Sequence, residues 1–174
     1  NPNIDSKSLD KISTGKNTDK FGIGIEEIDT IVNFLQSSKN LNLTSISCHI
    51  GSQINEINVF ANAFKIMKEA AQQFIEKGFK IDSIDLGGGI GVKYKDDDKT
   101  LDLNLLNKKI IKNFKDVSYE ISFEPGRYLV ANAGILVTSI ITTKNNGGIN
   151  YLIIDAGMNS LIRPALYNSY HLIE

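Results

Sequence analysis

The stretch Ile81-Asp82-Ser83-Ile84-Asp85-Leu86-Gly87-Gly88-Gly89, residues 81–89, reads as a β-strand that ends in glycines. A long helical pattern comes before it and closes at Gly78, which fits the C-terminal cap of a helix. A second helix is predicted over residues 103–114, and it leads into a strand over residues 119–123. The helical pattern that closes at Gly78 has a candidate core face that includes Phe60, Phe64, Met67, Ala71, Phe74 and Ile75.

Two more elements extend this order towards the start of the chain. Apolar residues at helical spacing predict a helix over residues 25–37, and the apolar run 43–50 reads as the first strand. Strands therefore alternate with helices, and residues suited to chemistry follow the strand ends. This arrangement is typical of a parallel α/β sheet or barrel.

The pattern changes after Ala131. Residues 135–143 and 149–155 are rich in β-forming side chains, and residues 144–148 between them resemble a hairpin turn. We therefore predict two domains, residues 1–131 in the α/β part and residues 132–174 at the start of an antiparallel, β-rich domain.

Composition excludes several classes of function. The chain has 174 residues and a net charge of −1, so no basic stripe is available to neutralise a nucleic-acid backbone. A single cysteine and two histidines exclude an internal disulfide and make a structural zinc site implausible. The acidic run 95–99 is expected to be a solvated loop rather than a metal site. With no apolar run long enough for a membrane span, we expect a cytoplasmic protein whose partner is a small molecule.

The glycines at 87–91 suggest a phosphate-binding turn. Backbone N–H groups of such a turn can surround a phosphate, because glycine permits close approach and unusual torsion angles. The alternative is a glycine turn that only lets a strand and a helix pack closely. A dinucleotide-binding fingerprint is excluded because position 92 is Val92, and the lysine of a Walker loop is missing.

His49 ends the first predicted strand and precedes Gly51-Ser52-Gln53. An imidazole can stack on an aromatic ring, and the polar turn can supply a hydroxyl and amides to a phosphate. A lone histidine at a strand end is also often a satisfied core residue. Cys48 should point to the opposite face of the strand, so a thiol–imidazole catalytic pair is not expected.

The segment Glu124-Pro125-Gly126-Arg127 places an acid and a guanidinium on one tight turn directly after a strand. This pair suits a cofactor that has both a ring nitrogen and a phosphate, although it also fits a surface ion pair. Arg163 and Tyr167 follow a loop after a later strand, where ligand-binding residues are common. Their alternative role is that of a rim cation and a packed aromatic residue.

Five segments together carry a resemblance to a known family. The chain resembles the diaminopimelate decarboxylases, a branch of the barrel-type, pyridoxal-phosphate-dependent amino-acid decarboxylases. The match runs along essentially the whole chain. The resemblance implies part of a parallel β/α barrel of the TIM type, followed by the start of a β-rich domain. The segments are KFGI (20–23), HIGSQI (49–54), DLGGGIGV (85–92), EPGRYLVANAG (124–134) and DAGMNSLIRPALY (155–167).

The resemblance also implies roles for individual residues towards pyridoxal 5'-phosphate and an amino-acid substrate. His49 would stack on the pyridine ring and Glu124 would pair with its nitrogen, which makes these two the implied catalytic residues. Arg127, Arg163 and Tyr167 would bind the carboxylate at the far end of the substrate. The cofactor phosphate would be held by Ser52, Gly87, Gly88, Gly89, Gly126 and Arg127.

The implied reaction is the decarboxylation of meso-2,6-diaminopimelate to L-lysine and carbon dioxide, by a homodimer with its active site at the subunit interface. The family's Schiff-base lysine segment and its later Cys-Glu-Ser motif are both missing from this sequence. We therefore expect a fragment that is inactive and poorly stable as a monomer. The alternatives are a related decarboxylase acting on ornithine, arginine or a carboxylated polyamine, and a non-catalytic regulator built on the same barrel.

Overall fold

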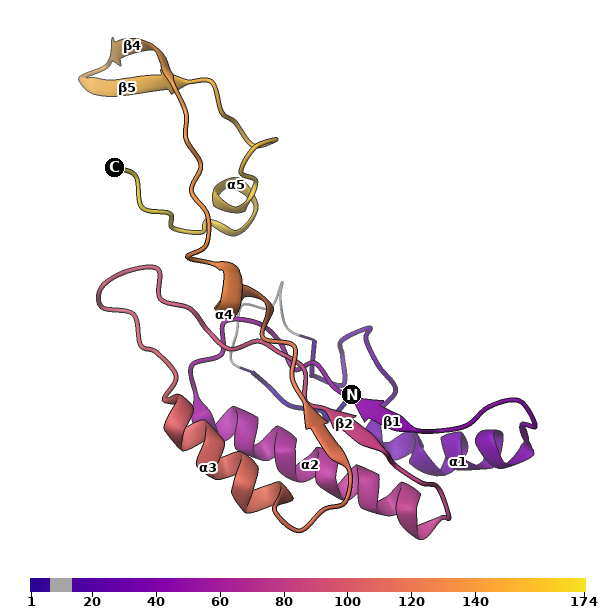
Figure 1. Cartoon of the computed structure of the whole chain (residues 1–174). Coiled ribbons are helices and arrows are strands. Elements are labelled where there is room, and N and C mark those ends of the chain that lie inside the picture. The colour runs from indigo at the N-terminus through magenta and orange to yellow at the C-terminus, as the bar shows by residue number, and fades with distance from the viewer. Residues whose placement is uncertain (7–13) are drawn as a thin grey trace. The chain divides into compact units, whose positions relative to one another are not determined.

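The computed structural model describes residues 1–6 and 14–174 and divides them into two units (Figure 1). The first unit comprises residues 1–92 and 99–130, and the second comprises residues 93–98 and 131–174. The first unit contains a small parallel sheet covered by helices. The second contains an antiparallel hairpin and a short helix. No helix among the described residues is long and apolar enough to cross a membrane.

The sheet of the first unit has the order β1-β2-β3, and both strand pairs are parallel. Its strands are β1 (Ser45–Ser47), β2 (Ser83–Asp85) and β3 (Glu120–Ser122). Helix α2 (Ile57–Glu76) connects β1 to β2, and α3 (Leu103–Phe114) connects β2 to β3. The predicted alternation of strands and helices in a parallel sheet is confirmed, although the paired strands are shorter than the apolar runs that predicted them.

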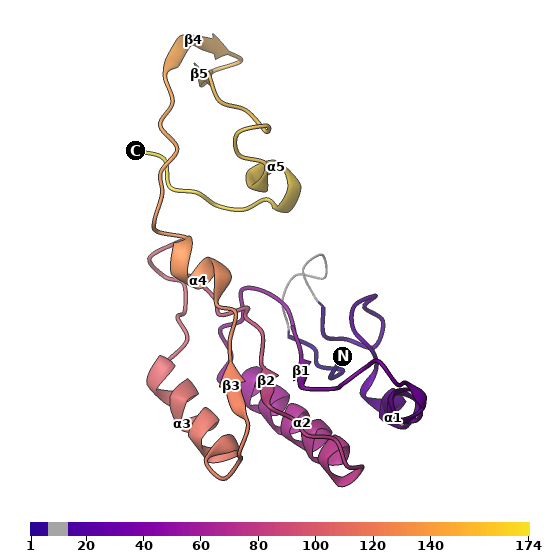
Figure 2. The ribbon, with the colours of Figure 1, turned by 45° about the vertical axis from the view of Figure 1, so that its right-hand side comes forward.

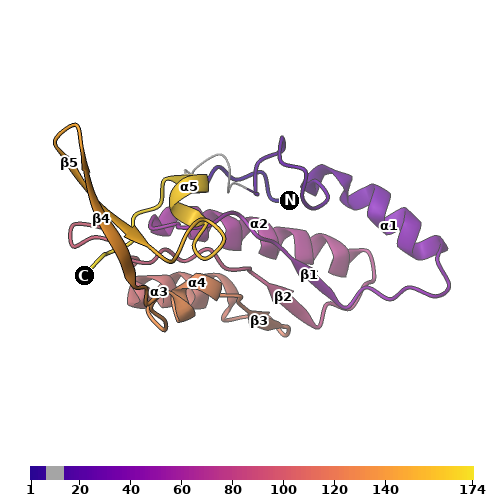
Figure 3. The same ribbon diagram turned by 90° about the horizontal axis from the view of Figure 1, so that it is seen from above.

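The helices lie side by side, with α2 between α1 (Ile28–Ser37) and α3 (Figures 2 and 3). A short 3-10 turn, η2 (Ile25–Glu27), leads into α1, so the predicted helix over residues 25–37 is confirmed. Helix α3 has the predicted bounds, because the Asp102 carboxylate accepts a hydrogen bond from the Leu105 N–H (3.0 Å) and caps its first turn.

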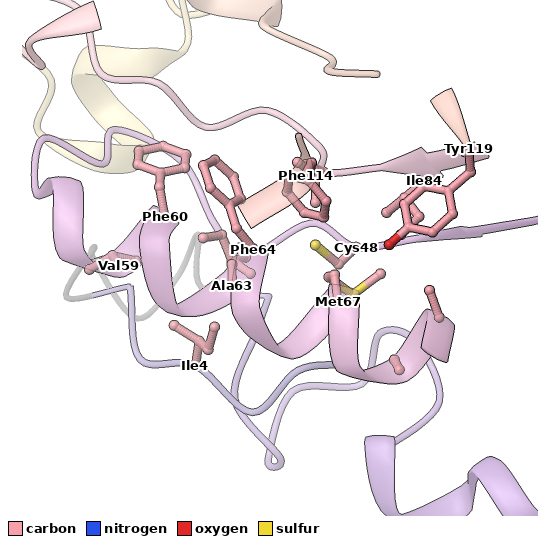
Figure 4. Close-up of a cluster of buried hydrophobic side chains, with 14 of the residues drawn as sticks. Ile4, Cys48, Val59, Phe60, Ala63, Phe64, Met67, Ile84, Phe114 and Tyr119 are labelled. Atoms are coloured by element: carbon pink, nitrogen blue, oxygen red, sulfur yellow. The ribbon is translucent and has the colours of Figure 1, made fainter. Parts of the chain in front are cut away.

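The apolar face of α2 forms the centre of the core, opposite Ile84 of β2 (Figure 4). Phe64 contacts the Phe114 ring of α3 with a centroid separation of 6.0 Å. The predicted core positions of α2 are buried except for Ile75, which is 38% exposed. That prediction is wrong because Phe74 occupies the core position of the last turn, and the next residue is rotated by about 100° around the helix axis.

Gly78 ends α2 as predicted. Its φ is +89°, and its N–H donates to the Ile75 carbonyl (3.0 Å). The N–H of Phe79 donates to the Phe74 carbonyl (3.0 Å), and the two phenyl rings meet edge to face at 6.1 Å. This is the Schellman arrangement with its hydrophobic contact, which glycine allows at no steric cost.

The second unit contains β4 (Ile140–Asn146) paired antiparallel with β5 (Ile149–Ile154). Gly147 and Gly148 join them with φ values of +59° and +81°. Both torsions are positive, as a two-residue hairpin turn of the primed type requires. The predicted turn over 144–148 is therefore too wide, since residues 144–146 continue the ladder of β4.

Residues 93–98 belong to the second unit through two aromatic contacts. The Tyr94 ring meets the His171 ring at 6.2 Å, and the Lys95 ammonium lies 5.1 Å from the centre of the Tyr170 ring. The Asp98 carboxylate accepts the backbone N–H groups of Tyr94 (2.8 Å) and Lys95 (2.9 Å), which lowers its pKa. No group of metal-binding side chains is found among the described residues.

Candidate active site

The two faces of the β1-β2-β3 sheet have different chemistry. Cys48, Ile84 and Leu86 are buried on the side of the helices. Because successive side chains of a strand point to opposite faces, the residues between them lie on the other face. Register places Ser47 beside Asp85, and Asp85 beside Ser122, so this second face is polar across all three strands.

Backbone hydrogen bonds continue this register beyond the strands. The Cys48 N–H donates to the Asp85 carbonyl (3.0 Å), and the Glu124 N–H donates to the Gly87 carbonyl (2.8 Å). His49, Gly87 and Glu124 therefore follow at the carboxyl ends of β1, β2 and β3. In parallel β/α folds this is the end at which active sites form.

His49 and Glu124 line the same cavity, whose volume is about 410 Å³. The structure thus brings together two residues that lie 75 positions apart in the sequence, as their numbers show. Glu124 is exposed at this opening, and no ion pair joins it to Arg127 in the described part of the chain, so the surface ion pair considered above does not form. The cavity is lined by Asn1, Pro2, Thr14, Phe21, Gly22, Ser47, Cys48, His49, Asp85 and Glu124.

The three glycines after β2 are packed against the backbone of neighbouring loops. A methyl group on Gly87 would collide with the Cys48 carbonyl, and one on Gly88 would collide with the Glu124 carbonyl. Gly89, whose φ is +89°, faces the Gly51 carbonyl in the same way. Close packing thus explains these glycines by itself, although the neighbours are loops rather than the helix considered above.

Several hydrogen-bond donors near these loops have no protein acceptor. Within residues 1–6 and 14–174, no protein group accepts from the backbone N–H of Ser52 or of Gly89. A guanidinium nitrogen of Arg127, Nη1, is buried and unpaired. Arg127 lies in α4 (Gly126–Val130), which begins directly after the β3 loop. A buried unpaired donor such as this Arg127 nitrogen is rare in folded proteins, and a bound anion would satisfy it.

Other donors at this end are already used inside the protein. The Gly87 N–H donates to the Asp85 carboxylate (2.7 Å), and the Gly88 N–H makes a long contact with His49 Nδ1 (3.4 Å). The Gly126 N–H donates to the Glu124 carbonyl (2.8 Å). Of the predicted phosphate-binding residues, Ser52, Gly89 and Arg127 therefore keep free donors.

Arg163 and Tyr167 lie in the second unit, at the two ends of α5 (Arg163–Tyr167). The guanidinium carbon of Arg163 is 5.4 Å from the centre of the Tyr167 ring, and its Nη2 donates to the Ser169 hydroxyl (3.2 Å). The arginine is thus oriented by its neighbours. The substrate-binding role of both residues stays a prediction.

One residue at this end was missed in the sequence, and another has a contact that was not expected. Asp85 lines the cavity and accepts the Gly87 N–H, while the Gln53 amide bonds both backbone groups of Val92. Polar residues at alternate positions of the 81–86 strand were a signal for Asp85. Gln53 was considered as part of a polar turn that supplies amides to a phosphate, and its bond to Val92 had no signal in the sequence. Cys48 also lines the cavity, but burial raises its pKa to about 12, so its thiol stays protonated near neutral pH.

Comparisons with known proteins agree with this geometry. The family model of the pyridoxal-dependent decarboxylases, pyridoxal binding domain, matches residues 1–131. Diaminopimelate decarboxylase from Aquifex aeolicus is 41% identical over 99% of this chain, and the match covers 41% of that protein. The enzyme from Haemophilus influenzae is 38% identical over 98% of the chain and 41% of its own length.

Solved structures show the same relationship. The crystal structure of diaminopimelate decarboxylase from Helicobacter pylori complexed with L-lysine superposes with a TM-score of 0.91 at 35% identity. It covers 99% of this chain, which corresponds to 43% of that structure. The chain therefore spans about two-fifths of the length of the relatives it matches.

Proposed function

The chain belongs to the family of pyridoxal-dependent decarboxylases, and on this premise we propose that its protein converts meso-2,6-diaminopimelate to L-lysine and carbon dioxide. The names of its relatives and the lysine bound to a structural neighbour support this substrate. The observation that carries the proposal is the shared cavity of His49 and Glu124 at the carboxyl end of the sheet.

The residues at this end fit the phosphate of pyridoxal 5'-phosphate. The free N–H groups of Ser52 and Gly89 and the unpaired nitrogen of Arg127 offer three donors to one anion. Gly87 and Gly88 keep the loop close to its neighbours, so that these donors are not covered by side chains. Gly126 has open space where a side chain would lie, which leaves room for a ligand beside it.

We assign the ring end of the cofactor to His49 and Glu124, which both line the cavity. When bound, the cofactor supplies an electron-accepting ring that stabilises the charge left by loss of carbon dioxide. The Glu124 carboxylate would hold a proton on the ring nitrogen and so keep the ring electron-poor. The His49 imidazole would pack against the ring and restrict its position. An arginine at position 124 would repel a protonated ring nitrogen and could not take this role.

The substrate end requires recognition of a second carboxylate. Planar guanidinium groups bind carboxylates through two parallel hydrogen bonds, and we assign this task to Arg127 and Arg163. Tyr167, whose ring lies beside the Arg163 guanidinium, is assigned to the same end of the substrate. A decarboxylase of ornithine or lysine would instead need an acidic residue facing the distal ammonium group. This difference in charge is the reason for preferring diaminopimelate.

The whole protein is proposed to complete the parallel sheet into a β/α barrel and to act in the cytoplasm as a homodimer with its active site at the subunit interface. Support comes from the relatives, which match this chain over nearly its full length. Size-exclusion chromatography with light scattering would measure the assembly. A monomer that retains full activity would contradict the dimer.

The reaction is tested by a substrate panel on the whole protein with pyridoxal 5'-phosphate. We expect lysine and carbon dioxide from meso-diaminopimelate, and no comparable turnover of L-ornithine, L-arginine or carboxylated polyamines. The L,L stereoisomer of diaminopimelate is the matched control, since it has the same charges but lacks the D-configured centre. Preferred turnover of ornithine or arginine would overturn the substrate assignment.

A further inference from the structure

The Gln53 side chain makes two hydrogen bonds to the backbone of one residue in the glycine loop. Its Nε2 donates to the Val92 carbonyl (2.9 Å), and its Oε1 accepts from the Val92 N–H (2.9 Å). An amide has one donor side and one acceptor side, so it can pair with a peptide unit as another backbone segment would. The Gln53 side chain thus adds one more pair of hydrogen bonds to the backbone pairing between the two segments.

That backbone pairing begins at the next residue along the chain. The Ile54 N–H donates to the Gly89 carbonyl (2.8 Å), and the Gly91 N–H donates to the Ile54 carbonyl (3.1 Å). Ile54 and Ile90 form an isolated parallel bridge, and Ile54 is 1% exposed. Residues 53–54 and 89–92 are therefore joined by four hydrogen bonds.

The two segments joined in this way carry the free donors assigned to the phosphate. Ser52 precedes Gln53 directly, and Gly89 is the first residue of the opposite segment. Gln53 has a φ of +60°, which places it in the left-handed region that non-glycine residues seldom occupy. The two hydrogen bonds of its amide offset the strain of this conformation, which lies directly beside Ser52 in the chain.

We propose that Gln53 is a positioning residue, whose side-chain amide fixes the Ser52 turn against the glycine loop so that both loops bind one phosphate group. This inference rests on the proposed function and names a further residue that its cofactor site needs. Gln53 acts through Ser52 and Gly89, and it is given no contact with the ligand. Its effect should therefore fall on the phosphate end of the cofactor and leave the ring end nearly unchanged.

Two substitutions separate the halves of the amide. Gln53→Glu keeps an oxygen for the Val92 N–H and places a second oxygen against the Val92 carbonyl. Gln53→Met has a similar length and makes neither hydrogen bond. Gln72→Met is the matched control, because Gln72 is exposed on α2 and, among the described residues, its side chain bonds only Glu76 (3.0 Å).

The readout compares two ligands on the whole protein, pyridoxal 5'-phosphate and pyridoxal, which lacks the phosphate. The preference is the ratio of the affinity for pyridoxal 5'-phosphate to the affinity for pyridoxal. We expect Gln53→Met to lower this ratio by roughly tenfold or more, the effect of losing about one to two net hydrogen bonds. The affinity for pyridoxal should change by less than about twofold, as for an ordinary surface substitution. Gln72→Met should change neither affinity.

Hydrogen exchange at the Val92 amide provides a measurement that does not depend on the ligand. The amide should be protected in the wild type and in Gln53→Glu, and it should exchange faster in Gln53→Met. An unchanged preference for the phosphorylated ligand in Gln53→Met, with the cofactor still bound, would overturn the role of Gln53 alone. A wild-type protein that binds neither ligand would instead overturn the proposed function, and the phosphate inferred here with it.

Discussion

Glu124 is the residue on which the proposed chemistry depends most, because its carboxylate is assigned to the ring nitrogen of the cofactor. Glu124→Gln keeps the shape of the side chain and removes that charge. We expect kcat to fall by roughly a hundredfold to a thousandfold, the range found when one positioned electrostatic group is removed. Cofactor affinity should change much less. Steady-state kinetics with meso-diaminopimelate and a cofactor titration would measure both.

Glu120→Gln is the matched control for Glu124, since both glutamates belong to the polar face of the sheet and Glu120 lies at the amino end of β3. The Glu120 substitution should leave kcat within about twofold, as expected for a group remote from the reacting atoms. Equal losses in the two variants would show that the charge of the whole face matters, and would contradict the specific role of Glu124.

Substitutions of Gly88 and Gly126 distinguish two roles for glycine at the same end of the sheet, close packing and contact with the ligand. A side chain at Gly88 would collide with the Glu124 carbonyl, whereas nothing lies within 4 Å of a side chain placed at Gly126. Gly88→Ala should therefore lower the free energy of unfolding by about 1–3 kcal/mol, the usual cost of overpacking. Gly126→Ala should change it by less than about 0.5 kcal/mol and still weaken cofactor binding.

Urea denaturation of the protein without cofactor measures the stability of both glycine variants, and titration with pyridoxal 5'-phosphate measures binding. Gly88→Ala should lower the stability measured in urea, whereas Gly126→Ala should lower the affinity measured by titration. A Gly126→Ala protein that binds the cofactor normally would show that position 126 does not face the ligand.

The end of α2 is the element whose local conformation follows most directly from one residue. Gly78 has a φ of +89°, and a side chain there would meet no atom within 4 Å, so only backbone strain opposes a substitution. Gly78→Ala should lower the free energy of unfolding by about 1 kcal/mol, the cost of a left-handed conformation for an ordinary residue. Gly78→Asn should cost less, because asparagine tolerates that conformation.

Thermal or urea unfolding of the two Gly78 variants provides the measurement. Both substitutions leave the core contacts of α2 intact, so their difference reports on the backbone alone. If alanine and asparagine destabilise the protein equally, the strain argument for this cap is incorrect.

Elements with a local signal were predicted well from the sequence, and those set by distant partners were not. The bounds of α3 follow from Asp102 and the apolar spacing, which are neighbours in the chain. The short paired lengths of β1, β2 and β3 depend on register between segments, and no local pattern specifies it. The hairpin turn was predicted too wide because polar residues 144–146 suit a turn as well as an exposed strand.

The candidate site divides in the same way. His49, Glu124 and the glycines were singled out because each stands next to a recognisable turn, and their segments resemble a known family. Gln53 and Asp85 act through hydrogen bonds to backbone groups, and a glutamine that bonds Val92 looks like any polar loop residue in the sequence. Hydrogen bonds between residues far apart in the sequence can be recognised only once the fold is known.

The first unit as a whole has an open sheet, and this has consequences for a protein made of residues 1–174 alone. Among the described residues, β1 and β3 each pair on one side only, and Ser47 and Glu124 are exposed on the polar face. Edge strands with free backbone groups pair readily with other chains. In the second unit every residue of β4 and β5 is exposed, and isolated two-stranded hairpins are marginal in water.

We therefore expect a protein of residues 1–174 to associate at micromolar concentration and to show no decarboxylase activity. Light scattering across a dilution series, together with circular dichroism on heating, would measure association and cooperativity. Adding surface charge to the hairpin with Ile141→Lys and Leu152→Lys should reduce association without restoring activity, because these two residues are 65% and 62% exposed and lie outside the first unit. A monomer that unfolds in one sharp transition, or one that releases carbon dioxide from diaminopimelate, would show that the open sheet is sufficient by itself.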